Sequence, residues 1–368
     1  MKKIMTLQLL LVSLASLPAA QSQAQTSGEP YDLAAFVQQL DALREAANIP
    51  RMSVAVVKSQ AVVLASGFGY ADVENGIPAT AETVYDIASV SKPLSAVLAL
   101  RLVEEGILDL DRPISDYSEW SNFCADFSQQ PSIFAQELRC QTAGHTLRHL
   151  LYHTATGVPS TQFSYNPILF SWASRPIMAA ADESFSTLVE QYVFDPAGMD
   201  ESARRHRNLP LREDMAQRLA PPYRIDSSGA TQRAPAPPPQ GDGAAGGVIT
   251  NVLDLAKFDI ALDQGVLISA ESKAEMMAAT TSRNGELLPY GLGWYVQEYQ
   301  GHKLVWHSGW WEDAYSALYL KVPALELSFI VLANSEGVWW GNPLDRAEVQ
   351  RSEFAQAFLR AFVTKNAH

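Results

Sequence analysis

The stretch Ala88-Ser89-Val90-Ser91-Lys92-Pro93 carries the strongest chemical signal in the chain. The hydroxyl of Ser89 and the amine of Lys92 are three residues apart, so on a helix they share one face and reach each other. This spacing suits a serine nucleophile that is activated by a lysine in place of a histidine. The alternative is an ordinary capped and solvated helix start, because S-x-x-K alone is a common pattern. The rest of the sequence must therefore distinguish the two interpretations.

The first residues are typical of a secretory signal peptide. Met1-Lys2-Lys3 is a basic start, an apolar run extends from Leu7 to Leu17, and Ser22-Gln23-Ala24 offers small residues for cleavage. We predict a signal peptide over 1–24 and an exported domain over 25–368, found in the periplasm or the medium. The apolar run is short for a membrane span, and no second candidate span is present.

Charge and cysteine content narrow the class of protein further. The chain has 27 basic and 40 acidic residues, with a net charge of −13 at pH 7. An acidic chain without a basic stripe is a poor candidate for binding nucleic acid. Cys124 and Cys140 are its only cysteines, and in an exported chain a disulfide between them is the default expectation.

Hydrophobic periodicity predicts strands near both ends of the chain and helices between them. A first helix follows Asp32, a candidate N-cap, and a second runs from about Ser89 to Glu105 and stops at Gly106. A closing helix carries Val349, Phe354, Phe358 and Phe362. The predicted strands are Ser53–Val57, Ala61–Ser66, Lys303–Trp306, Ala317–Lys321 and Leu327–Ala333, with a Gly-rich turn at Gly67-Phe68-Gly69 after the second.

The middle of the chain has a different character. An irregular helical pattern covers about 107–219, and a Pro/Gly-rich segment, read as a surface loop, covers 221–247. These features predict one antiparallel sheet that is built from both ends of the chain, flanked by helices, with a helical lobe inserted. The predicted fold class is therefore α/β plus an all-α region.

Several further blocks follow Ser89-Val90-Ser91-Lys92 in a familiar order. The chain resembles the serine β-lactamase/penicillin-binding-protein family, in its class C-like branch of esterases, D-amino-acid peptidases and β-lactamases. The matching blocks are Gly69-Tyr70-Ala71-Asp72, Thr146-Leu147-Arg148-His149-Leu150-Leu151-Tyr152-His153-Thr154, Pro196-Ala197-Gly198-Met199, Gly246-Gly247, Asp254-Leu255-Ala256, Tyr290-Gly291-Leu292-Gly293-Trp294 and His307-Ser308-Gly309. The resemblance covers nearly the whole mature sequence and implies the β-lactamase/transpeptidase-like fold.

The resemblance also implies roles for individual residues. Ser89 matches the acylated nucleophile and Lys92 its partner, whose pKa must fall if it is to act as a base. Tyr165, in Phe163-Ser164-Tyr165-Asn166-Pro167, matches the tyrosine of the Y-x-N motif, which exchanges a proton with the serine and the leaving group. The alternative for Tyr165 is a packed aromatic side chain.

The third family motif, K-[TS]-G, corresponds to His307-Ser308-Gly309 on a strand. His307 replaces a fixed positive charge by a titrating one, so an electrostatic role would depend on pH; the alternative is a structural histidine. By analogy, the backbone amides of Ser89 and Trp310 form the oxyanion hole. The substrate site is predicted to include Ser308, Gly309, Trp310 and Trp311, where the indoles would favour apolar or aromatic groups, although packing is the alternative for these tryptophans.

Pro167 departs from the family pattern, because an asparagine usually stands there. The amide of that asparagine orients the acylamino side chain of a β-lactam or peptide, and its absence weakens the case for an efficient β-lactamase or a standard D-alanyl-peptidase. Asn166 is one residue out of register and is expected to point elsewhere. Acylation chemistry itself is not affected.

A metal-dependent hydrolase is a weaker alternative. His145, His149 and His153 would lie along one face of a helix, but no H-E-x-x-H pattern is present and no carboxylate completes a ligand set. We predict neither a metal nor another cofactor. G-x-S-x-G is absent as well, which disfavours an α/β-hydrolase.

The sequence thus predicts an exported serine hydrolase that acts through an acyl-enzyme. Its expected partner is a small-molecule ester, amide or peptide, with carboxylic esters and small amides first, cell-wall D-peptides second and β-lactams third. Tyr165 or a water linked to His307 would activate the deacylating water. The competing hypothesis is a penicillin-binding sensor or pseudo-enzyme that is acylated without efficient turnover.

Overall fold

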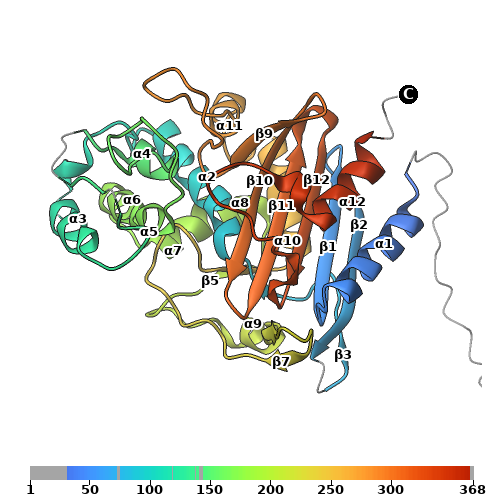
Figure 1. Cartoon of the computed structure of the whole chain (residues 1–368). Helices are drawn as coiled ribbons and strands as arrows, with labels where there is room; N and C mark the ends of the chain where they lie inside the picture. The colour runs from blue at the N-terminus through green and yellow to red at the C-terminus, as the bar shows by residue number, and fades with distance from the viewer. Residues whose placement is uncertain (1–30, 73–74, 118, 137, 141–143, 365–368) are drawn as a thin grey trace, which may run out of the picture.

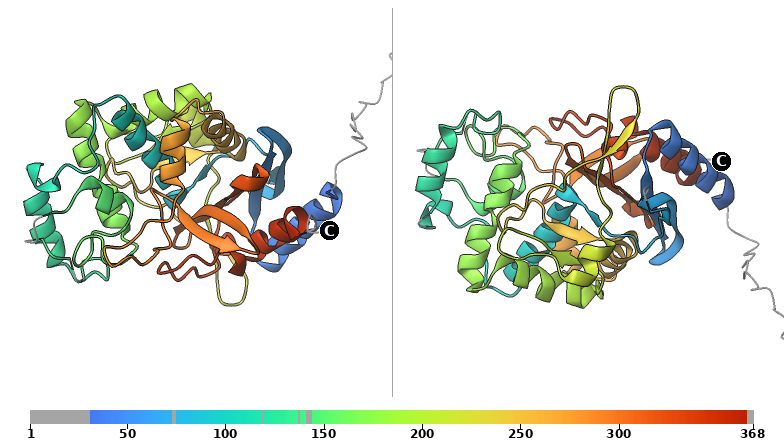
Figure 2. Two further views of the ribbon diagram at one scale, coloured as in Figure 1. Left: turned by 90° about the horizontal axis from the view of Figure 1, so that it is seen from above. Right: turned by 90° about the horizontal axis from the view of Figure 1, so that it is seen from below.

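The computed structural model describes residues 31–72, 75–117, 119–136, 138–140 and 144–364 (Figure 1). The predicted signal peptide, 1–24, lies outside these ranges. A seven-stranded antiparallel sheet is flanked by helices on both faces, and a helical lobe extends from one side of it (Figures 1 and 2). The predicted fold class is therefore confirmed. In the described ranges, no helix is both long enough and apolar enough to cross a membrane.

The sheet joins the two ends of the chain, as predicted. Its strand order is β3-β2-β1-β12-β11-β10-β9, and the central pairing of β1 with β12 sets Val54 opposite Val331. Both faces of β1 are buried, which explains its nearly continuous apolar sequence. The strands are β1 (Arg51–Lys58), β2 (Ala61–Asp72), β3 (Ile77–Pro78), β9 (Tyr295–Tyr299), β10 (His302–Trp311), β11 (Tyr315–Val322) and β12 (Leu327–Ala333).

Two terminal helices cover one face of this sheet. α1 (Leu33–Ala46) begins at Asp32, whose side chain accepts the amide of Ala35 at 2.9 Å, as predicted for an N-cap. α12 (Glu353–Phe362) lies beside α1, and the rings of Phe358 and Phe329 stack between helix and sheet at 4.9 Å. The aromatic residues at helical spacing near the C-terminus thus build the core of this layer.

The other face is covered by α2 (Ser91–Glu104) and α10 (Val252–Asp263), and α2 stands between the sheet and the lobe (Figure 1). Lobe and flanking helices are short: α3 (Trp120–Ser128), α4 (Leu147–Leu151), α5 (Pro167–Trp172), α6 (Ser174–Ala181), α7 (Phe185–Val189), α8 (Asp195–Ala197), α9 (Glu213–Arg218) and α11 (Ala270–Met276). Cys124 and Cys140 form a disulfide in the lobe, as expected. Short strands β4 (Tyr85–Asp86), β8 (Val248–Thr250) and β5 (Ala203–Arg204) form a second, small sheet.

Three local predictions were wrong. Gly67-Phe68-Gly69 is not a turn, because β2 continues to Asp72. A Cβ at position 67 would lie 2.4 Å from the backbone of Ala79, so this glycine permits close approach of two chain segments. The segment 221–247 is not loop throughout but holds a hairpin, β6 (Tyr223–Ile225) and β7 (Thr231–Arg233), and strand β9 was missed.

Candidate active site

Ser89 lies in a single 3-10 turn, Ala88–Val90, directly before α2, rather than inside the predicted helix. Ala88 has a φ of +47°, a conformation that non-glycine residues rarely adopt and that is typical of strained functional turns. The amide of Ala88 donates to Asp86 Oδ1 at 2.9 Å, which holds this turn. Ser89 stays partly exposed, so a substrate can reach its hydroxyl.

Lys92 lies in the first turn of α2 and is fully buried. Its Nζ lies 2.7 Å from Ser89 Oγ and 3.4 Å from the carbonyl oxygen of Ala245. Within the described residues, Lys92 pairs with no carboxylate. Burial lowers the pKa of Lys92 well below its ordinary value, because the charged form loses water and gains no counter-ion. The neutral amine can accept a proton from Ser89.

Tyr165 reaches the same two groups from the loop before α5. Its hydroxyl lies 2.7 Å from Lys92 Nζ and donates to Ser89 Oγ at 3.0 Å. Burial raises the pKa of Tyr165, so the phenol is protonated and acts as a donor. The ring of Tyr165 packs at 4.5 Å from that of His153. The structure thus brings together Ser89, Lys92 and Tyr165, although 73 residues separate the lysine from the tyrosine.

Asn166 and Pro167, which follow Tyr165, do not point toward Ser89, Lys92 and Tyr165. Asn166 is the N-cap of α5: its Oδ1 accepts the amide of Leu169 at 3.0 Å and its Nδ2 donates to the carbonyl of Phe134 at 2.6 Å. Pro167 occupies the first position of α5, where its lack of an N–H costs little. The side-chain amide of Asn166 is therefore hydrogen-bonded inside the lobe.

His307, Ser308 and Gly309 lie on β10, whose second half has a strand neighbour on one side only. β11 pairs with residues 305–311, whereas the pairing with β9 ends at Trp306. A Cβ at Gly309 would lie 2.2 Å from the carbonyl oxygen of Ile87, so only glycine lets β10 come this close to the turn that carries Ser89. This approach brings the backbone of β10 next to the turn of Ser89, the predicted nucleophile.

His307 is fully buried, and both of its ring nitrogens are engaged. Nδ1 lies 2.7 Å from the carbonyl oxygen of Ser308, which can only accept, so Nδ1 carries the proton. Nε2 is then an acceptor and takes the hydroxyl proton of Tyr290 at 2.9 Å. Burial, with Lys92 nearby, lowers the pKa of His307 well below its ordinary value. His307 is therefore neutral at neutral pH and offers no unoccupied basic nitrogen.

Trp310 and Trp311 point to opposite faces of β10, as the alternation of a strand requires. The Trp310 indole is 42% exposed, stacks on Trp339 at 5.7 Å and donates to Glu336 at 2.7 Å. Trp311 donates from Nε1 to Asp86 Oδ1 at 3.0 Å, which ties it to the Ser89 turn.

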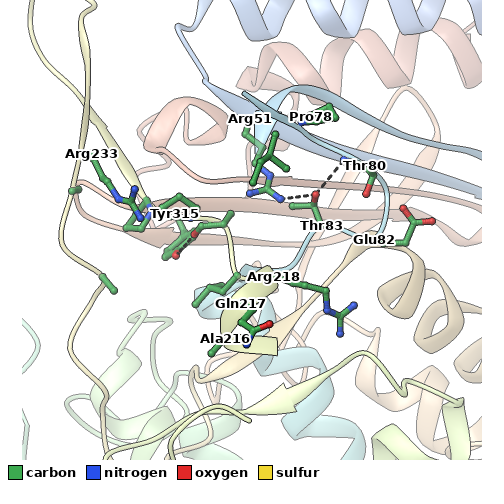
Figure 3. A pocket seen from close by; sticks show the side chains of 17 residues that line it. Arg51, Pro78, Thr80, Glu82, Thr83, Ala216, Gln217, Arg218, Arg233 and Tyr315 are labelled. Carbon is green, nitrogen blue, oxygen red and sulfur yellow. Dashed lines mark hydrogen bonds between the residues drawn. The ribbon is translucent and has the colours of Figure 1, made fainter. Parts of the chain in front are cut away.

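Two cavities border this region of the molecule. One of about 670 Å³ lies between the Pro-rich residues 234–238 and the β10–β11 turn, and of the predicted site residues only Trp311 lines it. Another, of about 600 Å³, lies between Pro78, Arg218 and Arg233, with Tyr315 on one wall (Figure 3). None of the predicted site residues lines this second cavity.

The three histidines considered for zinc are not aligned on one helix face, because α4 covers only Leu147–Leu151. His145 Nε2 lies 2.8 Å from the carbonyl oxygen of Ala155, and His149 Nδ1 accepts the Thr146 amide at the start of α4. His153 Nδ1 accepts the amide of Asn166 at 3.0 Å. Each histidine thus makes a separate structural contact.

Sequence reasoning missed two residues at this site. Asp86, three residues before Ser89, accepts hydrogen bonds from the turn that carries Ser89 and from Trp311 at the end of β10. Tyr290 lies in one of the matching sequence blocks, but its bond to His307 follows only from the folded chain. No sequence signal identifies Asp86, because one of its donors, Trp311, is 225 residues away along the chain.

Comparison with known proteins identifies the family to which the sequence is similar. The profile of the Beta-lactamase family matches residues 33–350. A penicillin-binding protein of Bacillus subtilis is 25% identical over 341 residues, which cover 80% of this chain and 67% of the relative. The chain spans about three fifths to two thirds of the length of the first curated relatives that it matches.

Solved structures share the fold. The D-amino acid amidase of Ochrobactrum anthropi SV3 superposes with a TM-score of 0.68 at 19% identity, covering 91% of this chain and 100% of the amidase. EstCE1, described as a hydrolase with promiscuous acyltransferase activity, gives a TM-score of 0.68 at 18% identity, covering 88% and 98% of the two chains. At these identities the likeness concerns the fold alone.

Proposed function

The chain belongs to the Beta-lactamase family, and from this premise we propose that it is an exported serine hydrolase that cleaves carboxylic esters or small amides through an acyl-enzyme. The observation that carries the proposal is the position of Lys92. A buried amine with no carboxylate partner among the described residues lies 2.7 Å from both Ser89 Oγ and the Tyr165 hydroxyl. A solvated helix start would not bury its lysine in this way.

Acylation follows from these contacts. Neutral Lys92 takes the proton of Ser89 as Oγ attacks the substrate carbonyl. The backbone amides of Ser89 and Trp310 hold the oxyanion, because β10 lies against the turn that carries Ser89. Tyr165 then donates its proton to the leaving group and regains one from Lys92, which lies 2.7 Å away.

Water releases the acyl group by the reverse proton path. In our proposal Tyr165 takes the proton of the attacking water while its own hydroxyl proton passes to Lys92, 2.7 Å away, and a proton returns to Ser89 Oγ as the acyl group leaves. His307 is not the base, since its two nitrogens are already engaged with Ser308 and Tyr290. In this scheme His307 contributes through its place in the hydrogen-bonded wall of the site and not through charge.

The substrate ranking depends on Asn166 and Pro167. Because the Asn166 amide is used inside the lobe, it does not take the place of the asparagine that orients an acylamino group. Esters and small amides do not need this contact.

The test is a paired measurement of kcat/KM for a short-chain p-nitrophenyl ester and a chromogenic cephalosporin, with Ser89→Ala as control. We expect a clear preference for the ester and loss of turnover in the folded Ser89→Ala protein. A preference for the cephalosporin would overturn the substrate ranking. Unchanged turnover in Ser89→Ala would overturn the nucleophile assignment.

A penicillin-binding sensor is the second candidate, favoured specifically by the incomplete Y-x-N motif at Tyr165-Asn166-Pro167. Such a protein would be acylated once and would not turn over. Intact mass spectrometry separates the two functions: a stoichiometric, long-lived adduct supports the sensor, and a transient adduct with steady product release supports the hydrolase.

A further inference from the structure

Asp86 is a buried carboxylate on which three segments of the chain converge. It ends the short strand β4 and is 2% exposed. Its Oδ1 accepts the amide of Ala88 at 2.9 Å and the indole N–H of Trp311 at 3.0 Å, and its Oδ2 pairs with Arg205 at 3.3 Å. Burial raises the pKa of Asp86, and the Ala88 amide and Arg205 oppose that shift.

Two of these donors adjoin the proposed active site, and the third adjoins a cavity beside it. Ala88 is the left-handed residue directly before Ser89. Trp311 directly follows Trp310, whose backbone amide is the proposed second oxyanion donor. Arg205 also donates to the carbonyl of Pro237 at 3.2 Å, on the Pro-rich wall of the 670 Å³ cavity.

The two bonds at Oδ1 bear directly on the oxyanion hole. One end of that hole lies on the turn after Ala88, and the other lies on β10 just before Trp311. Oδ1 of Asp86 accepts hydrogen bonds from both the Ala88 turn and Trp311, and so links the turn to the end of β10. A change in the distance between turn and strand would change the spacing of the two oxyanion donors.

We infer that Asp86 is a positioning residue that sets the spacing of the two oxyanion amides by holding the Ala88 turn and the end of β10 on one oxygen atom. Asp86 does not contact Ser89 Oγ, Lys92 or Tyr165 in the bonds described, so it acts through backbone geometry. The inference rests on the proposed function, since it assumes that Ser89 is the nucleophile.

The chain contains a matched control for this role. Glu336 Oε1 also accepts an indole N–H, from Trp310 at 2.7 Å, and a backbone amide, from Asp313 at 2.9 Å. The chemistry is the same as at Asp86, but that amide lies in the β10–β11 turn and not beside the nucleophile. Loss of Glu336 removes an equivalent pair of bonds while the Ala88 turn keeps its own.

The experiment compares Asp86→Ala, Asp86→Asn, Trp311→Phe and Glu336→Ala in full-length protein with a p-nitrophenyl ester. We expect Asp86→Ala to lower kcat about 100-fold with little change in KM, as for the loss of an oxyanion donor. Asp86→Asn keeps an acceptor at the Oδ1 position and should recover much of this loss. Trp311→Phe keeps a ring and loses one bond, which predicts a fall in kcat of about tenfold. Glu336→Ala loses the bond to the Trp310 indole but leaves the Ala88 turn held by Asp86, so its fall in kcat should be much smaller than that of Asp86→Ala.

The outcomes separate this inference from the proposed function. Wild-type kcat in folded Asp86→Ala, or an equal loss in Glu336→Ala, would overturn the positioning role while Ser89→Ala remained inactive. Retained turnover in Ser89→Ala would overturn the function itself. If Asp86→Ala does not fold, Trp311→Phe decides: a lower kcat at unchanged KM supports the role, and unchanged kinetics refute it.

Discussion

Replacement of Tyr165 by phenylalanine tests the separate roles proposed for Tyr165 and Lys92 in proton transfer. The change removes one hydroxyl that lies 2.7 Å from Lys92 Nζ and 3.0 Å from Ser89 Oγ. The ring keeps its packing against His153 and its stacking with Tyr295 at 6.0 Å. The fold should therefore survive, with a loss of about 1 kcal/mol in unfolding free energy for the missing hydrogen bonds.

The expected kinetic effect is large and selective. Proton transfer by a positioned side chain contributes about 10²–10⁴-fold to a rate, so kcat for a p-nitrophenyl ester should fall by that factor. Lys92 still lies 2.7 Å from Ser89 Oγ, so the serine should remain reactive toward a fluorophosphonate probe. Lys92→Met, in contrast, should abolish both turnover and labelling.

Steady-state kinetics, probe labelling followed by mass spectrometry, and thermal unfolding of Tyr165→Phe and Lys92→Met provide the assay. Near-wild-type kcat in a folded Tyr165→Phe protein would refute the role of Tyr165 in proton transfer. Complete loss of labelling in that variant would show instead that Tyr165, and not Lys92, activates Ser89.

Three further results are expected. Because burial lowers the pKa of Lys92, the proposed base loses activity when it gains a proton, so kcat/KM should fall as the pH drops through that lowered pKa. An acid limb near the ordinary histidine pKa that disappears in His307→Gln would contradict this. Gly309→Ala should push β10 away from Ile87, which should lower the unfolding free energy by about 1–3 kcal/mol and also lower kcat. Gly241→Ala is the control, because a Cβ at that position meets open space, and it should match wild type in unfolding and kinetic assays. Removal of the disulfide by Cys124→Ser with Cys140→Ser should lower unfolding free energy by about 3 kcal/mol for a loop of this length, and denaturant unfolding that is identical to wild type would contradict this.

Sequence patterns predicted the features that depend on local spacing or on block order. Strand β12 was placed at its observed ends, Leu327–Ala333, because its apolar run is continuous, and the Asp32 cap followed from residue type. Block order indicated that Tyr165 belongs with Ser89. The Gly67-Phe68-Gly69 segment was misread because the neighbour that requires a glycine there, Ala79, is ten residues or more away along the chain.

Features that depend on contacts between residues far apart in the chain could not be predicted. His307 looked like a titrating charge, and only its contacts with Ser308 and Tyr290 show that both nitrogens are engaged. Asp86 carries no motif of its own, since its role arises from two donors on separate segments. Residue type and spacing carry no information about such convergence.

The low pKa of Lys92 is a property of the assembled lobe and not of the S-x-x-K sequence. The rings of Tyr165 and Phe170, both from the lobe, lie 5.0 and 5.5 Å from Nζ, and Ala245 closes the site from the segment before β8. Water that entered between these groups would hydrate the ammonium form and raise the pKa of the base toward its ordinary value. By excluding water from Lys92, the lobe favours the neutral form of the amine, and only this form can accept the proton of Ser89.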